Sequence, residues 1–176
     1  ENIQSLNELA SIMSSSSFRV YTSSDIIGVQ LGGAFKNIVA IAVGASDALS
    51  LGANARTALI SRGLEEMKSI GVAFGAKPET FFGLSGLGDL VLTSTDDQSR
   101  NRRLGLLIGS GMPLDKATEN LGTTPEGAHA VKALYKKQAL HEGLPIANAV
   151  YSILFEGVPA ESLVDKLMTR PLKEEL

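Results

Sequence analysis

Gly28-Val-Gln-Leu-Gly-Gly-Ala-Phe-Lys-Asn-Ile-Val-Ala-Ile-Ala42 is the stretch that decides the fold of this chain. It lies in a longer run, residues 24–49, that has no proline and few polar residues. Such a run is too long for a strand and is apolar on most sides, so it predicts a buried central helix. A membrane span is the alternative, but Gln30, Lys36 and Asn37 lie in its middle, where each would be costly in lipid.

Lys36 has very small neighbours on its own face of this helix, because Gly33 and Gly32 precede it by three and four residues. Either another helix or a ligand needs the space that these glycines leave. Burial disfavours the charged form of a lysine, which makes Lys36 a candidate proton donor or acceptor. The alternatives are that Lys36 extends to the surface, or that it forms a fixed internal ion pair with Asp47, Asp89 or another carboxylate.

Length and composition limit what the chain can be. With 176 residues, 44% hydrophobic content and a net charge of -3, it can bury one core, and we expect one main domain. The absence of a long Lys/Arg tract argues against a general nucleic-acid binder. The chain has no cysteine, and its histidines, His129 and His141, have no partner at metal-ligand spacing, so we expect no metal site.

Helical periodicity continues along most of the chain, and only Phe18–Thr22 has the alternation of a short extended segment. We therefore predict an all-α fold, a multi-helix bundle-like domain around the central helix. An amphipathic helix at 2–13 and a polar spacer are assigned to the end of a preceding domain (residues 1–17), and residues 18–176 to the helical domain. The remaining predicted helices are 54–74, 78–82, 99–108, 114–121, 125–141, 146–155 and 160–168.

A glycine-rich segment, Gly83-Leu-Ser-Gly-Leu-Gly-Asp89, predicts a tight turn followed by a carboxylate. Its glycines are in the order G-x-x-G-x-G, the reverse of a dinucleotide fingerprint, and no strand precedes them. Asp89 is a candidate for orienting Lys36 or for binding a substrate hydroxyl. A simple turn or helix cap is the alternative role for this aspartate.

A basic cluster, Ser99-Arg-Asn-Arg-Arg103, precedes an apolar helical stretch. Ser99 is expected to cap that helix, which leaves first-turn amides free to bind an anion such as a phosphate. The arginines would otherwise oppose the helix dipole. The alternative is that Asp96 and Asp97 pair with these arginines on a solvated turn.

A third motif, Thr123-Thr-Pro-Glu126, fits a capping box with Thr123 as the cap and Glu126 three residues later. From the motif alone the cap is the favoured interpretation. A cofactor contact from Thr124 or Glu126 is the alternative.

Three of these segments together resemble the NAD(P)-dependent glycerol-3-phosphate dehydrogenases of bacterial type: residues 28–42 with Lys36-Asn37, residues 83–92 with Asp89, and Gln98-Ser-Arg-Asn-Arg-Arg-Leu-Gly105. The resemblance runs from about Phe18 to Arg170-Pro-Leu172. It matches the family's helical C-terminal substrate domain, of the 6-phosphogluconate dehydrogenase C-terminal type. It implies reversible reduction of dihydroxyacetone phosphate to sn-glycerol 3-phosphate with NAD or NADP, for phospholipid synthesis in the cytoplasm.

The resemblance also implies roles for single residues. Lys36 would be the catalytic proton donor and acceptor and would also touch the substrate. The other residues implied to bind substrate are Asp89, Ser99, Arg100 and Asn101, and those implied to contact the cofactor are Arg100, Thr124 and Glu126. Thr124-Pro125 departs from the aliphatic pair expected there.

The partners implied by the resemblance are a phosphorylated triose and an N-terminal dinucleotide-binding domain that this sequence lacks, so the chain alone is expected to be inactive. The resemblance allows a homodimer and implies neither nucleic acid nor a membrane span. One alternative is the helical domain of another two-domain dehydrogenase acting on 3-hydroxy acids or 6-phosphogluconate. A second alternative is a non-catalytic module that binds a phosphorylated metabolite or a partner.

Overall fold

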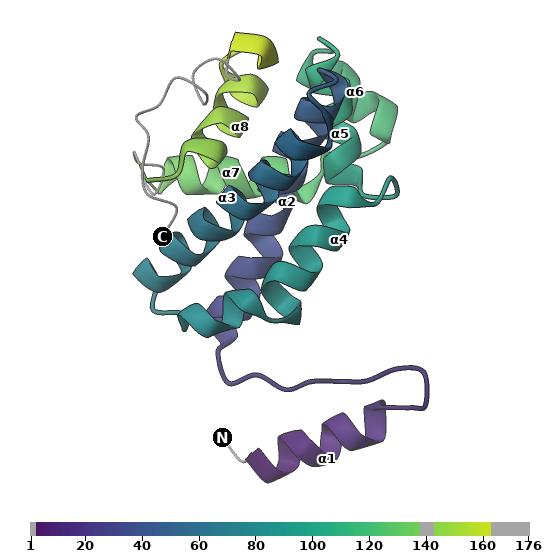
Figure 1. Ribbon diagram of the computed structural model, residues 1–176, viewed down its shortest axis with the longest axis vertical. Coiled ribbons are helices and arrows are strands. Elements are labelled where there is room, and N and C mark those ends of the chain that lie inside the picture. The colour runs from purple at the N-terminus through teal and green to yellow at the C-terminus, as the bar shows by residue number, and fades with distance from the viewer. Residues whose placement is uncertain (1–2, 138–142, 163–176) are drawn as a thin grey trace.

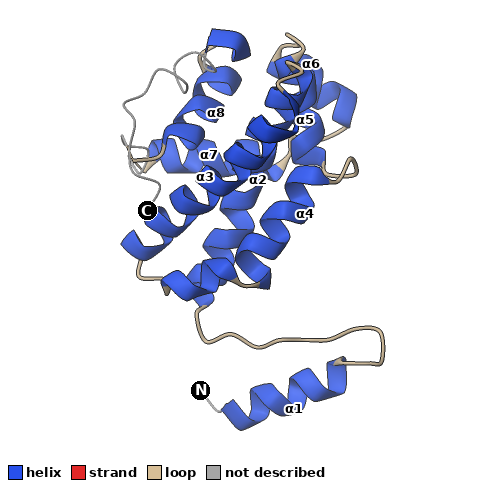
Figure 2. Ribbon diagram, in the orientation of Figure 1, coloured by secondary structure: helices blue, strands red, loops and turns tan. Residues whose placement is uncertain are grey.

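A computed structural model describes residues 3–137 and 143–162, and this part of the chain is helical with connecting loops and no strand (Figure 2). The all-α prediction is therefore confirmed. Ten elements follow one another: α1 (Ile3–Met13), α2 (Ile26–Ala48), α3 (Gly52–Ala73), η1 (Pro78–Phe82), η2 (Leu84–Gly88), α4 (Asp89–Thr95), α5 (Arg100–Gly109), α6 (Leu114–Leu121), α7 (Glu126–Lys136) and α8 (Pro145–Phe155).

Helix α2 is the centre of the fold, as its apolar sequence predicts. It packs against α3, α4, α5, α7 and α8, which lie around it in Figure 1. Asp25 caps its first turn by accepting the Gly28 amide at 2.9 Å. Its largest fully buried side chains include Phe35, Ile38 and Ile41. By length and composition α2 is the one helix among the described residues that could cross a membrane, yet half of its apolar window is buried inside the protein, and core helices pass the same test.

Glycines set the very close contact between α2 and α5. A Cβ at Gly44 would lie 2.1 Å from the Arg102 carbonyl oxygen, and a Cβ at Gly105 would lie 2.1 Å from the Ile41 carbonyl oxygen. Asn101 is bonded to Asn37, and Gly105, four residues later in α5, lies against Ile41, four residues later in α2. The two helices therefore run in the same direction. The N-terminus of α5 therefore points toward the N-terminal half of α2.

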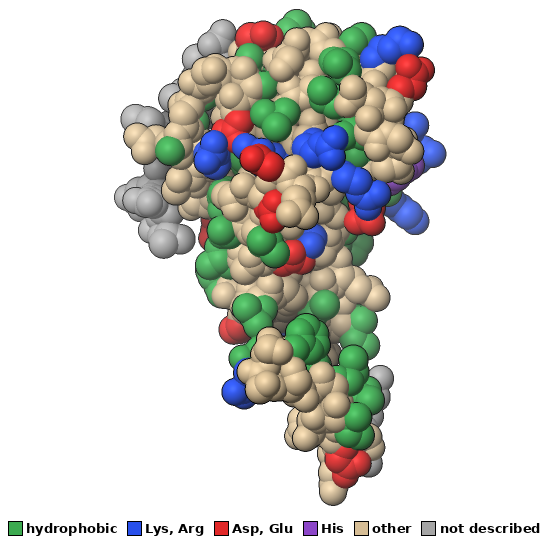
Figure 3. Space-filling model, turned by 90° about the vertical axis from the view of Figure 1, so that its right-hand side faces the viewer, with side chains coloured by type: hydrophobic (Ala, Val, Ile, Leu, Met, Phe, Trp, Pro, Cys, Tyr) green, Lys and Arg blue, Asp and Glu red, His purple; other side chains and the backbone are tan. Residues whose placement is uncertain are grey.

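Helix α1 projects away from this body and is joined to it by a loop that contains Phe18–Thr22 (Figure 1). The extended segment predicted there forms no strand with any described residue. Hydrophobic side chains run along the projecting segment in Figure 3. Among them Leu9, Ile12 and Met13 are exposed. The packed body of the protein leaves this apolar stripe of α1 uncovered.

Two local predictions are wrong, and both have a physical reason. The segment from Gly83 to Asp89 is not a plain turn, because a π-helical turn (η2) leads directly into α4, a helix that the sequence pattern missed. Gly86 is needed because its backbone lies against Phe81, whose carbonyl oxygen would be 2.2 Å from a Cβ. Thr123 does not cap α7, whose N-cap is Pro125. The predicted ends at residues 141 and 168 lie outside the described residues.

Candidate active site

Lys36 projects from α2 to the start of α4, where its Nζ donates to Asp89 Oδ2 and forms an ion pair with it. Thr93, one turn further along α4, donates its hydroxyl to the other carboxylate oxygen at 3.2 Å. The side chains of Lys36 and Asp89 are 20% and 35% exposed, so a ligand can reach both. Of the carboxylates considered from the sequence, Asp89 is the one that pairs with this lysine.

The next residue of α2, Asn37, connects the lysine helix to two other elements. Its Nδ2 donates to Glu126 Oε2 at 3.3 Å, and its Oδ1 accepts from Asn101 Nδ2 at 2.9 Å. Asn101 Oδ1 in turn accepts the amide of Gly127 at 2.8 Å. This chain of bonds holds the N-termini of α5 and α7 against Asn37, the residue that follows Lys36. It also explains why α7 needs no local cap, since Asn101 accepts one of its first amides.

Ser99 caps α5 as predicted, because its hydroxyl accepts the Arg102 amide at 3.3 Å. The amides of Arg100 and Asn101 have no acceptor inside the helix, and none is found for them within residues 3–137 and 143–162. The Arg100 side chain is exposed and makes no ion pair with any described residue. The start of α5 therefore presents free amides and a free guanidinium, which suits an anion.

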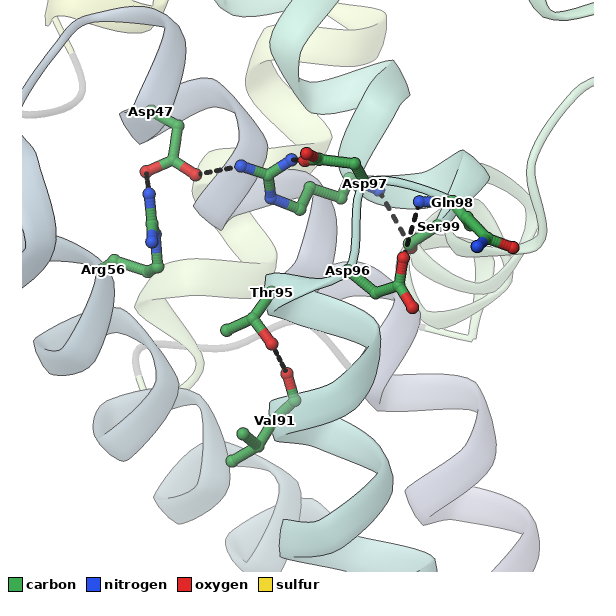
Figure 4. A network of polar contacts seen from close by, with 9 residues as sticks. Asp47, Arg56, Val91, Thr95, Asp96, Asp97, Gln98 and Ser99 are labelled. Carbon is green, nitrogen blue, oxygen red and sulfur yellow. Dashed lines mark hydrogen bonds and ion pairs between the residues drawn. The ribbon is translucent and has the colours of Figure 1, made fainter.

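Arg102 has a different role from the one that the basic cluster suggested. Its guanidinium is buried and pairs with Asp47 at 2.8 Å and with Asp97. Asp47 also accepts from Arg56 at 3.0 Å, and Figure 4 shows this carboxylate between Arg56 and the second guanidinium, which reaches on to Asp97. Pairing with Asp97 agrees with one part of the alternative interpretation, but Arg102 is buried rather than on a solvated turn, and Asp96 accepts the Gln98 amide instead of an arginine. The network fixes the loop before Ser99 onto the C-terminal end of α2.

The structure thus brings together most, but not all, of the predicted site residues. Lys36 and Asp89 form one bonded pair, and Asn101 and Glu126 are both bonded to Asn37, the residue that follows Lys36. Ser99 and Arg100 adjoin Asn101 at the start of α5. Thr124 stands apart: it is exposed and has no hydrogen bond to a described residue.

Sequence reasoning missed two residues of this group as candidates. Asn37 directly follows the lysine, and Thr93 lies four residues after Asp89, a spacing that has meaning only once α4 is known to be a helix.

An apolar cavity of about 150 Å³ lies elsewhere, between α2, α3 and α8, and none of the site residues lines it. Lys36 and Asp89 instead form a partly exposed pair between α2 and α4, and the next residue of α2, Asn37, is bonded to the first turns of α5 and α7. The chemistry available there is an ammonium group that can exchange a proton, a carboxylate that orients it, and a helix terminus suited to an anion.

The fold and the site define a class: an all-α domain built around one central helix, with a lysine–carboxylate pair on that helix. Residues 25–165 match the family model described as the NAD-dependent glycerol-3-phosphate dehydrogenase C-terminus. The chain belongs to this family. The family-level resemblance expected from the sequence is therefore confirmed.

Similar proteins support the same assignment over nearly the whole chain. The glycerol-3-phosphate dehydrogenase [NAD(P)+] of Clostridium botulinum (strain Alaska E43 / Type E3) is 46% identical over 177 residues, which cover 100% of this chain and 54% of that protein. That of Vibrio parahaemolyticus is 51% identical over 92% of this chain and 47% of its own length. The crystal structure of glycerol-3-phosphate dehydrogenase from Coxiella burnetii has a TM-score of 0.88 at 46% identity and covers 97% of this chain and 53% of that one. The chain spans about half the length of these relatives.

Proposed function

We propose that this chain is the substrate-binding part of an oxidoreductase that interconverts sn-glycerol 3-phosphate and dihydroxyacetone phosphate with NAD or NADP. The observation that carries this proposal is that Lys36, paired with Asp89, directly precedes Asn37, and that Asn37 is bonded to Asn101 at the open N-terminus of α5. A phosphorylated ketone needs both features, since it has an anionic end and a carbonyl that must gain a proton when it is reduced.

The phosphate of the substrate binds at the start of α5. The free amides of Arg100 and Asn101 point at it, the helix dipole favours its charge, and the exposed Arg100 guanidinium pairs with it. Ser99 contributes by holding the first turn in the helical conformation through its cap bond. The buried Arg102 pair with Asp47 keeps the preceding loop in place and is not a ligand.

Lys36 transfers the proton between its Nζ and the reacting oxygen of the substrate. In the direction of reduction its ammonium group donates a proton from Nζ to the carbonyl oxygen of the substrate, and in the direction of oxidation the neutral amine accepts the proton of the alcohol. Asp89 orients Nζ by accepting its hydrogen bond, while Thr93 holds the carboxylate from its other side. Asn37 fixes the neighbouring turn of α2 through Glu126 and Asn101.

The bound nicotinamide cofactor supplies or removes the hydride. The polar groups around the site fit contact with such a cofactor: the Glu126 carboxylate suits a hydroxyl, the free Arg100 guanidinium suits a phosphate, and Thr124 is exposed close to α7. The sequence contains no G-x-G-x-x-G after a strand. We therefore assign most of the dinucleotide site to the rest of the polypeptide, which the relatives contain and this chain does not.

The same proposal includes the compartment of the enzyme, the use of its product and its second domain. It acts in the cytoplasm, its product supplies phospholipid synthesis, and its polypeptide carries a dinucleotide-binding domain before residue 18. A homodimer is compatible with this proposal and is tested by the mass of the full-length enzyme in solution.

The proposal is tested by assaying the full-length polypeptide for oxidation of NADH and NADPH in the presence of dihydroxyacetone phosphate. We expect turnover with this substrate and none with 6-phosphogluconate or a 3-hydroxy acid in the reverse assay. Residues 1–176 alone are expected to unfold cooperatively and to show no turnover. Activity only on 6-phosphogluconate or on a 3-hydroxy acid would contradict the proposed substrate, and turnover by residues 1–176 alone would contradict the assigned division of labour.

A further inference from the structure

Gly33 differs from the other glycines of α2. A Cβ at Gly28 would lie 2.2 Å from Asp25 Oδ2, one at Gly32 would lie 2.5 Å from the Ser85 carbonyl oxygen, and one at Gly44 would lie 2.1 Å from the Arg102 carbonyl oxygen. These three glycines are required by neighbouring protein atoms. A Cβ at Gly33 would have no such neighbour within 4 Å. Packing among residues 3–137 and 143–162 does not explain a glycine at this position.

Intrinsic helix stability does not explain it either. Glycine in the interior of a helix is less favourable than alanine, and Gly33 lies in the interior of a 23-residue helix. Its φ is not positive, so alanine could adopt the same backbone conformation. Gly33 is therefore a residue that weakens the helix, and the space beside it holds no atom of the described part of the chain.

The location of that space is defined by the groups around it. Gly33 lies three residues before Lys36 and four before Asn37, which places all three on neighbouring parts of one helix face. Asn37 donates to the Gly33 carbonyl oxygen at 3.1 Å and is bonded to Asn101 at the start of α5. Because α5 runs parallel to α2, the space beside Gly33 lies beyond the N-terminus of α5, one turn from its first residues.

We propose that Gly33 is a specificity-determining residue: its missing side chain leaves room for the carbon chain of the three-carbon substrate between the phosphate site at α5 and Lys36. This inference rests on the proposed function. An anion at the start of α5 and a carbonyl at Lys36 must be joined by the carbon chain of one molecule, and the bare backbone at Gly33 borders the path between them. A methyl group at this position would occupy that path.

The test is Gly33→Ala in the full-length enzyme, with three measurements: the melting temperature, the KM for dihydroxyacetone phosphate, and the inhibition constant of inorganic phosphate. We expect a melting temperature equal to or above that of the wild type, because alanine favours the helix and meets no protein atom. The KM should rise by about tenfold or more, the usual effect of one misplaced methyl group. Inorganic phosphate, which needs only the α5 site, should inhibit both proteins equally.

Gly44→Ala is the matched control on the same helix, and its added methyl group should lower the melting temperature because it collides with α5. An unchanged KM in Gly33→Ala would overturn the inference, and so would equal weakening of triose phosphate and inorganic phosphate. Failure of the wild-type enzyme to use dihydroxyacetone phosphate would instead refute the proposed function, so the two failures are distinguishable.

Discussion

At the scale of single residues, Asp25 shows how one carboxylate can hold several segments. Its Oδ2 accepts the Thr80 hydroxyl at 2.6 Å and the Lys77 amide at 2.9 Å, while its Oδ1 accepts the Gly28 amide at 2.9 Å. The Thr80 bond, followed by the Gly28 amide, lowers the pKa of Asp25 below its ordinary value of 3.8, against the opposing effect of burial. Asp25 thus ties the start of α2 to the α3–η1 connection.

This pKa shift predicts a pH dependence of stability. A carboxyl group with a lowered pKa in the folded state stabilises that state fully above its unfolded pKa, and this contribution is lost as the pH falls through the folded pKa. The difference in unfolding free energy between wild type and Asp25→Asn should therefore be constant above about pH 5 and should shrink below pH 3.8. Urea unfolding of both proteins across this range measures it, and a difference that grows on acidification would contradict the assignment.

The residues that could be predicted from the sequence are those whose partners are local. Ser99 was identifiable as a helix cap because the amide that it accepts is three residues away. Arg102 was grouped with the anion-binding arginines because Asp47, its buried partner, is 55 residues away. The sequence also left the carboxylate partner of Lys36 open between Asp47, Asp89 and others, and only the fold, which places α4 beside α2, selects Asp89.

At the scale of helices, long periodic segments were predictable and short irregular ones were not. The apolar run of α2 indicated a central helix, and the predicted bounds of α6 agree with the structure. Helix α4 was missed because the glycines of η2 resemble a turn, although one of them, Gly86, serves close packing on Phe81. The capping box at Thr123 failed because Asn101, from α5, accepts an amide of α7 in place of a local cap.

The first amides of α8, like those of α7, donate to a side chain from another helix. Helix α8 has no side-chain cap of its own, and the buried carboxylate of Glu66 in α3 accepts the amides of Ile146 at 2.7 Å and Ala147 at 3.1 Å. The negative charge also complements the positive end of the α8 dipole. The contact between α3 and the start of α8 therefore includes buried hydrogen bonds to Glu66.

Replacing Glu66 with glutamine should lower the unfolding free energy by about 1–3 kcal/mol, because an amide NH₂ would face backbone donors that then lack an acceptor. Chemical denaturation measures the change. The neighbouring Glu65→Gln variant is the control: its partner Lys68 lies 2.6 Å away in a half-exposed pair, so the loss should be within about 0.5 kcal/mol. Equal losses in the two variants would show that Glu66 does not cap α8.

At the scale of the whole molecule, the chain consists of a packed helical body and a projecting N-terminal helix (Figure 1). The apolar stripe of α1, which includes Ile12 at 82% exposure, is not covered by that body. The assignment of residues 1–17 to a preceding domain remains a prediction. Within the body, Lys36 pairs with Asp89 of α4, and the next residue of α2, Asn37, is bonded to the first turns of α5 and α7.

The measurement that tests the account most directly is steady-state kinetics of Lys36→Ala in the full-length enzyme, with Lys116→Ala, an exposed lysine on α6, as the control. Loss of the proton donor should reduce kcat by about 10²- to 10⁴-fold with little change in the KM for dihydroxyacetone phosphate. A melting temperature close to that of the wild type would show that the fold is intact. A kcat within about twofold of the wild-type value would contradict the central claim that Lys36 transfers the proton.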